Sequence, residues 1–281
     1  MYPMGDELIL NHFFTTRVLA SQNQCYKTVV NRFVQDAKGK TNSEIISEIY
    51  ELMGKTHRCE YVYQNTLLNA LLLSASSDAQ QTALTQLPVS KSRADLIIIS
   101  KHATVYEIKT ELDTFERLKT QLSNYFKAFN RVCVVTSENK YQHAINALAG
   151  THVGIYVLDG QNCISEKMRK EPVEDNSQLE HVTLFKLLRK TEYENILKQY
   201  FNALPDAKPV FYYNACLDMF CQIPILNAQT MVMSELRKRN IIKNIDTFNR
   251  VPYALKSLAY FSYNTKKNLN NLLRFLDEKF I

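Results

Sequence analysis

The middle of the chain carries three side chains whose types suit phosphodiester chemistry: Asp95, Glu107 and Lys109. Two carboxylates held close together repel each other, and the pKa of one of them rises unless a cation lies between them. The hard ion Mg²⁺ fits that position, because it binds carboxylate oxygens and backbone carbonyls such as that of Ile108. A bound ion of this kind activates water for attack on a phosphate, and the Lys109 ammonium would balance the negative charge that develops.

Two short runs rich in β-branched and aromatic residues predict the strands that position these three side chains. The runs are Leu96–Ile99 and Val105–Ile108. If Ser100–Ala103 forms the connecting hairpin, Asp95 falls opposite Glu107 or Ile108. Because side chains alternate across a strand, Glu107 and Lys109 share one face. Both carboxylates are therefore expected at one end of a sheet.

A simpler interpretation of the same pattern remains open. An aspartate followed ten to fifteen residues later by Glu-x-Lys occurs by chance in many proteins. In that case Asp95 and Glu107 would be solvated strand ends, and Lys109 would form a cross-strand ion pair that contributes less than about 1 kcal/mol.

A helix predicted over 113–129 follows the second strand, with an apolar face formed by Phe115, Leu118, Leu122 and Phe126. Gln121 and Tyr125 lie four residues apart at the edge of this face, so their side chains are neighbours. They are placed to overhang the charged end of the sheet. The alternative is that Tyr125 lies at the rim of the helix and that Gln121 is merely solvated.

These residues together resemble the PD-(D/E)XK nuclease superfamily. The resemblance rests on the strand-borne Asp95, on Glu107-Ile108-Lys109, and on the helix with Gln121-x-x-x-Tyr125, which is similar to the helix of RecB-type and lambda-exonuclease-type members. Residues 58–160 are also similar to a poorly characterised bacterial and phage family of nuclease-like proteins. That similarity is carried by Arg58–Tyr63, Arg93–Asp95, Tyr106–Asp113, Glu116–Leu118 and Phe129–Val132.

The resemblance implies roles for individual residues. Asp95 and Glu107 would hold Mg²⁺ or Mn²⁺, and Lys109 would lie beside the attacked phosphate. A glutamate on the helix before the sheet often joins the metal site of this superfamily, and Glu60 occupies that position, with Glu51 as the second choice. Gln121 and Tyr125 would contact substrate or support the site. The proline of the family motif is replaced by Ala94, a position that does not itself bind metal.

The fold class implied is α/β: a restriction-endonuclease-like mixed β-sheet core flanked by helices, preceded by N-terminal helices and followed by an all-helical region. Apolar spacing predicts the helices, and β-branched runs predict further strands at 132–135 and 153–158. We expect three parts: an N-terminal helical segment (1–57), a nuclease-like core (58–170) and a basic helical C-terminal region (171–281).

The positive charge of the chain is concentrated near its C-terminus. The net charge is +6, and residues 180–281 hold 15 Lys and Arg against 9 Asp and Glu, whereas residues 1–179 hold 19 of each kind. Arg237, Lys238 and Arg239 form the densest basic cluster, and we expect the cations from Arg237 to Lys243 to be exposed. Cations interleaved with aromatic residues suit a surface that binds nucleic acid without reading its sequence. A solvated helix bundle with an aromatic core would show the same pattern.

Other classes of function lack the residues they need. The six histidines form no H-E-x-x-H or H-x-x-x-H pair for zinc, and the six glycines form no phosphate-binding loop. The six cysteines include no C-x-x-C pair and are expected to be reduced thiols. With no apolar run of about 18 residues and no basic leader, we expect a cytoplasmic protein without a membrane partner.

The sequence thus predicts a Mg²⁺- or Mn²⁺-dependent nuclease, with DNA favoured over RNA as substrate. The alternative from another class is a non-catalytic, nuclease-like module that binds nucleic acid or protein in a phage or defence system. Both hypotheses, the nuclease and the non-catalytic module, are compatible with a homodimer or with a required partner protein.

Overall fold

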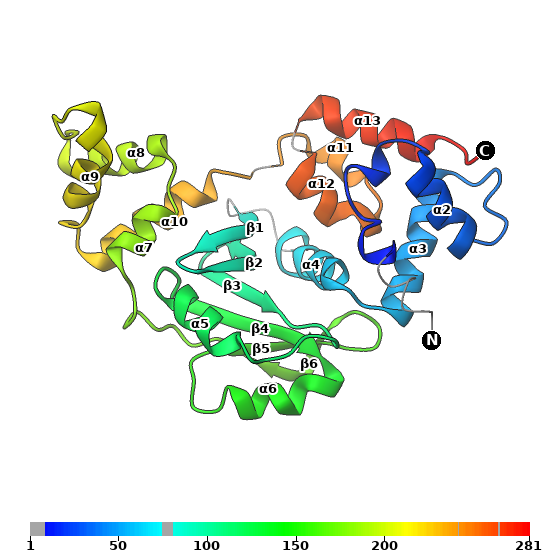
Figure 1. Cartoon of the computed structure of the whole chain (residues 1–281), viewed down its shortest axis with the longest axis horizontal. Helices are drawn as coiled ribbons and strands as arrows, with labels where there is room; N and C mark the ends of the chain where they lie inside the picture. The colour runs from blue at the N-terminus through cyan, green and yellow to red at the C-terminus, as the bar shows by residue number, and fades with distance from the viewer. Residues whose placement is uncertain (1–8, 75–80, 241, 264) are drawn as a thin grey trace.

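The computed structural model describes residues 9–74, 81–240, 242–263 and 265–281. Its centre is a mixed sheet of six strands in the order β1-β2-β3-β4-β5-β6, with helices on both faces (Figure 1). The strands are β1 (Thr82–Val89), β2 (Ser92–Ile99), β3 (Ala103–Ile108), β4 (Arg131–Ser137), β5 (Gly154–Leu158) and β6 (Ile164–Lys170). The mixed α/β class expected from the sequence is confirmed.

The helices are more numerous than the strands and differ widely in length. They are α2 (Gln24–Phe33), α3 (Asn42–Thr56), α4 (Glu60–Leu68), α5 (Leu118–Phe126), α6 (Tyr141–Ala147), α7 (His181–Lys186), α8 (Lys190–Phe201), α9 (Pro209–Phe220), α10 (Ile225–Arg237), α11 (Ile245–Asn249), α12 (Lys256–Ser262) and α13 (Lys266–Asp277). Short 3₁₀ turns cover Val18–Ala20, Glu138–Lys140 and Tyr253–Leu255, and a π-helical turn, Asn69–Leu73, extends α4.

Strand pairing sets the geometry of the sheet end that carries the candidate site. β1, β2 and β3 are antiparallel neighbours, β3, β4 and β5 are parallel, and β6 returns antiparallel to β5. In the β2–β3 hairpin, Leu96 pairs with Tyr106 and Ile99 pairs with Ala103. Continuing this register by one step places Asp95 opposite Glu107, which is one of the two positions expected from the sequence.

Two strands escaped the sequence analysis because neither shows a plain alternating pattern. β1 contains Pro88 and a left-handed residue, Gln86, with φ of 53°. β6 lies at the edge of the sheet, and its run Ile-Ser-Glu-Lys-Met-Arg-Lys is only half-buried or exposed. The helix expected over 113–129 is shorter at both ends, since α5 covers only Leu118–Phe126.

The two faces of the sheet have separate cores. Leu96, Ile98 and Tyr106 pack on one face with α2, α3, α4 and the last helices, α11 to α13. Ile97 and Val105 face the other side, where α5, α6 and the group α7 to α10 pack. The region after residue 171 is helical past β6, as expected, but its helices divide between the two faces (Figure 1).

The start of α3 lies against the segment that follows α13. Thr41 caps α3 in a capping box with Glu44, which satisfies backbone N–H groups that the first turn leaves without partners. Thr41 also forms a β-bridge with Lys279, and the backbone N–H of Phe280 donates to the carbonyl of Lys40 at 2.9 Å. The N-terminal helices and α13 therefore complete one core together.

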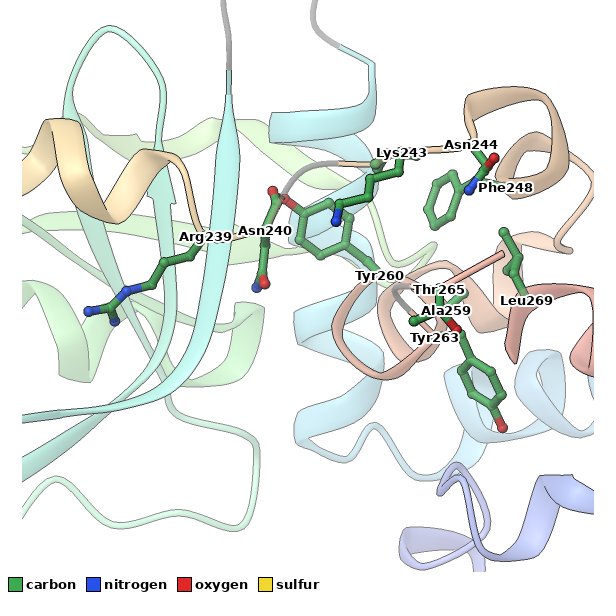
Figure 2. Close-up of a pocket in the computed structure, with 11 residues that line it drawn as sticks. Arg239, Asn240, Lys243, Asn244, Phe248, Ala259, Tyr260, Tyr263, Thr265 and Leu269 are labelled. Carbon is green, nitrogen blue, oxygen red and sulfur yellow. Dashed lines mark hydrogen bonds between the residues drawn. The ribbon is translucent and has the colours of Figure 1, made fainter. Parts of the chain in front are cut away.

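The connection from α10 to α11 crosses from one face of the sheet to the other beside β1. Asn240 holds it there: its carbonyl accepts hydrogen bonds from Thr82 Oγ1 and Tyr260 Oη, and its side chain donates to the carbonyl of Ala83. A pocket of about 200 Å³ lies next to this crossing (Figure 2).

The basic cluster at the end of α10 is not the exposed patch that the sequence suggested. Arg239 forms an ion pair with Glu192, and its side chain is only 8% exposed. In Figure 2 it extends away from Lys243. Arg237 is half-buried and donates from Nη2 to the carbonyl of Ser100 at 2.7 Å, so only Lys238 of these three is exposed. Lys243 is exposed as expected. The expectation of exposure is wrong for both arginines, because acidic and carbonyl partners distant in the sequence fold against them.

The six cysteines are free thiols. Across the described ranges, the structure contains no helix that is both long and apolar enough to cross a membrane.

Arg239→Ala is expected to lower the free energy of unfolding by about 3 kcal/mol, because it leaves the carboxylate of Glu192 buried without its cation. Arg250 provides the matched control. Its ion pair with Asp277 is long, at 3.9 Å, and exposed on both sides, so Arg250→Ala should cost less than about 1 kcal/mol. Urea denaturation of both variants measures the loss of unfolding free energy in each. Equal losses would mean that the buried Arg239–Glu192 pair stabilises the fold no more than the exposed Arg250–Asp277 pair does.

Candidate functional site

One end of the sheet brings Asp95, Glu107 and Lys109 together. Asp95 Oδ2 accepts a hydrogen bond from the backbone N–H of Ile108 at 2.9 Å. Lys109 Nζ lies 2.7 Å from Glu107 Oε1, with the Glu107 side chain 1% exposed and that of Lys109 9% exposed. The interpretation of Glu107 as a solvated strand end is therefore wrong, because its carboxylate is buried and paired with Lys109, the residue that directly follows β3, while Asp95 is half-buried.

Helix α5 supplies two more contacts to the same carboxylate. Gln121 Nε2 donates to Glu107 Oε1 at 2.5 Å, and Gln121 Oε1 accepts from Lys109 Nζ at 3.0 Å. The Tyr125 hydroxyl lies 2.5 Å from Glu107 Oε2 and 2.9 Å from the carbonyl of Arg93. Tyr125 is fully buried, so it is not a rim residue of the helix, and Gln121 is not merely solvated.

Burial and mutual repulsion make this site electrostatically unusual. Burial, together with the negative charges of Glu107 and Glu60, raises the pKa of Asp95 from 3.8 to about 8. Burial and the nearby Glu107 carboxylate also raise the pKa of Tyr125 well above its ordinary value, which keeps this hydroxyl protonated and able to donate. The site thus holds more negative charge than Lys109 alone offsets.

Glu60 is the first residue of α4 and lies near the other carboxylates. Partial loss of solvent around its carboxylate, together with the charges of Glu107 and Asp113, raises the pKa of Glu60. The residue as a whole is exposed. Gln86 of β1 donates to Glu60 Oε1 at 3.1 Å. The second choice, Glu51, is an exposed residue of α3.

Several residues that the sequence analysis did not select also shape the site. The carbonyl of Asp95 accepts from Thr85 Oγ1 at 2.8 Å and from Gln64 Nε2 at 3.4 Å. Ser257 of α12 in turn donates to Gln64 Oε1 at 2.9 Å. Sequence spacing gave no signal for this chain of hydrogen bonds, because it joins α12, α4, β1 and β2 across the fold.

The donor set suits a hard divalent cation. Asp95, Glu107 and Glu60 offer carboxylate oxygens, and Asp95 Oδ1 accepts no hydrogen bond from the described residues. The excess of carboxylates over ammonium groups is the condition that a cation would relieve. Among the residues that the structure describes, however, no three His, Cys, Asp or Glu side chains are already arranged to hold a metal ion.

Comparison with known proteins places the chain in a family. The sequence profile described as "Bacteriophage P4 protein cII" matches residues 53–277, a range that contains every residue of the site described above. The chain belongs to this family. It is similar to the protein named "Protein cII" of Enterobacteria phage P4, with 23% identity over 191 residues, which cover 65% of this chain and 69% of that protein. No solved structure matches the chain.

Asp95→Asn should stabilise the metal-free chain increasingly as the pH rises. Between about pH 4 and pH 8 the folded protein keeps a proton on Asp95 that the unfolded chain releases, so the unfolding free energy of the unaltered chain falls across this window. Asparagine cannot ionise, yet its amide oxygen can still accept from Ile108. Urea denaturation in EDTA at pH 5, 6, 7 and 8 measures the gap. Asp206→Asn, at an exposed loop carboxylate, is the control, and a gap independent of pH for Asp95→Asn would contradict the raised pKa.

Tyr125→Phe is expected to lower the free energy of unfolding by about 2 kcal/mol, because it removes a hydrogen bond to a buried carboxylate. Tyr193→Phe is the matched control. Tyr193 is also buried, and its ring stacks on Phe185, but its hydroxyl makes no hydrogen bond with the described residues. That variant should be nearly neutral in the same denaturation experiment. Similar losses in the two variants would show that the Tyr125 hydroxyl is not important for Glu107.

Proposed function

We propose that the chain is a metal-dependent nuclease that hydrolyses phosphodiester bonds in DNA. The observation that carries the proposal is the buried Glu107–Lys109 pair beside Asp95, in a site where carboxylates outnumber ammonium groups. A protein core gains nothing from such an arrangement unless an ion or a substrate uses it, because buried like charges destabilise the fold.

The arrangement of elements around the site supports a restriction-endonuclease-like fold. A hairpin, β2–β3, carries Asp95 and then Glu107 and Lys109, and α5 leads from it to β4, which lies parallel to β3. The Gln121 and Tyr125 side chains of α5 reach the Glu-x-Lys segment. This order of strand, strand, helix and parallel strand is similar to that of the PD-(D/E)XK superfamily.

The residues would divide the reaction among them. Asp95 and Glu107, with Glu60 and the backbone carbonyl of Ile108, would hold Mg²⁺ or Mn²⁺, and a bound ion lowers the pKa of water and polarises a phosphoryl oxygen. Lys109 places its ammonium where negative charge develops on the attacked phosphate. Gln121 orients that ammonium through its carbonyl oxygen. Tyr125 fixes Glu107 by donating from its hydroxyl to the other carboxylate oxygen, Oε2.

The DNA-binding surface must be different from the cluster chosen from the sequence. Arg237 and Arg239 are engaged within the fold, which leaves Lys238 as the exposed member. Other exposed cations of the C-terminal region suit phosphate contacts and a binding affinity that falls with salt: Lys243, Lys266, Lys267 and Arg274. RNA remains the second substrate choice, and assembly as a homodimer or with a partner protein is compatible with this proposal.

One observation favours a second candidate, a non-catalytic module that binds nucleic acid or protein. Both oxygens of Glu107 already accept hydrogen bonds from protein groups, and within the described ranges no three-ligand arrangement exists. A site built only for stability would keep these bonds and would never bind a metal ion.

Cleavage assays on plasmid, linear duplex, single-stranded DNA and RNA, with Mg²⁺, Mn²⁺ or EDTA, separate the two candidates. We expect metal-dependent cleavage of DNA, reduced at least about 100-fold by Glu107→Gln and by Lys109→Met, since each removes a charge that acts in the reaction. Lys119→Ala is the control, because Lys119 is exposed on the same helix, α5, as Gln121.

Circular dichroism must show that each variant is folded. If the unaltered protein cuts none of these substrates, or if the folded Glu107 and Lys109 variants cut as well as it does, the nuclease proposal is wrong and the binding module becomes the better account.

A further inference from the structure

Strand β1 contains an irregularity directly opposite Asp95. Gln86 has φ of 53°, a left-handed conformation that only a few per cent of non-glycine residues adopt. The ladder pairs Thr85 with Leu96 and Leu87 with Ala94, but the intervening pair of Gln86 and Asp95 is missing from it.

The irregularity shifts the side-chain alternation of both strands. Leu84 and Leu87 of β1 pack against the same core although they lie three residues apart, and so do Ala94 and Ile97 of β2. In a regular strand, residues three apart point to opposite faces. Gln86 and Asp95 are therefore the two positions at which the alternation changes, while the register on either side of them stays the same.

Both strands use the altered geometry at the carboxylate cluster. Asp95 directs its carboxylate to the backbone N–H of Ile108, while its own carbonyl is held by the side chain of Thr85. Gln86 directs its amide to the carboxylate of Glu60. A strained residue thus holds the one acidic side chain of the cluster that comes from a helix rather than from a strand.

We infer that Gln86 is a positioning residue of the proposed metal site: its left-handed backbone aims Asp95, and its side-chain amide holds Glu60 towards the same cation. The inference rests on the proposed function. Glycine or asparagine would adopt this left-handed conformation at lower cost, but glycine could not supply the side-chain hydrogen bond to Glu60.

Substitution of Gln86 should leave the Tm equal or higher while it lowers the affinity for Mn²⁺. Gln86→Asn and Gln86→Gly relieve the backbone, so each variant should have a Tm equal to or above that of the unaltered chain. Neither new side chain can reach Glu60 as glutamine does. Isothermal titration with Mn²⁺, without DNA, should therefore show a Kd about tenfold weaker, the usual effect of losing a group that orients a ligand.

Ser90→Gly is the matched control. Ser90 also has a left-handed backbone, with φ of 54°, but it follows the end of β1 at the turn into β2. This variant should change the Tm in the same direction and leave the Mn²⁺ affinity within about twofold. In a Glu60→Gln background, Gln86→Asn should weaken Mn²⁺ binding no further, because the two changes remove the same interaction.

The outcomes also separate this inference from the proposed function. If the unaltered chain binds Mn²⁺ and cleaves DNA but Gln86→Asn binds Mn²⁺ equally well, the inference is wrong and the nuclease stands. If Gln86→Asn weakens Mn²⁺ binding equally in the unaltered and the Glu60→Gln backgrounds, Gln86 does not act through its hydrogen bond to Glu60. If the unaltered chain binds no Mn²⁺ at millimolar concentration, both the metal site and the role of Gln86 are overturned.

Discussion

The carboxylate of Glu107 is buried, and the local structure depends on how its charge is compensated. An ionised carboxylate is costly to remove from water unless cations and hydrogen-bond donors surround it. Lys109, the residue directly after β3, supplies the cation, while Gln121 and Tyr125 supply donors from α5. These contacts hold α5 against the end of β3, with Gln121 and Tyr125 level with Glu107. In this position the apolar face of α5 packs on the sheet.

The second acidic strand residue has a different environment. Asp95 receives one backbone N–H and no cation at comparable distance among the described residues, so its proton is retained to a pH at which Glu and Asp are ordinarily ionised. Asp95 therefore resembles other carboxyl groups whose surroundings move the pKa away from its ordinary value. Membership of the bacteriophage P4 protein cII family describes ancestry, whereas the chemistry proposed for this chain is argued from these surroundings.

The sequence was sufficient for features that depend on neighbours along the chain. Alternation within β2 and β3 and a short hairpin predicted that Asp95 would lie opposite Glu107 or Ile108, and the register selects Glu107. Spacing along α5 placed Tyr125 next to Gln121. It was insufficient where partners lie far apart. Glu192, 47 residues away in the sequence, forms the ion pair with Arg239, and no local sequence pattern predicts that contact. The left-handed backbone of Gln86 could not be predicted either, since glutamine has no particular preference for that conformation. The break it makes in the alternation is one reason why β1 was not predicted.

The contact of the N-terminal helices with the segment around α13 affects how the chain can fold during synthesis. Helix α4, which carries Glu60 and Gln64, packs on a core that includes Leu272, Phe275 and Phe280. On the ribosome, domains assemble from the N-terminus as the chain emerges. Here the early helices leave the exit tunnel long before their partner α13 has been translated. The sheet and α5 can form first, but the helix that presents Glu60 gains its full support only after α13 has emerged and packed on the same core. The acidic cluster is thus completed late in the synthesis of this part of the chain.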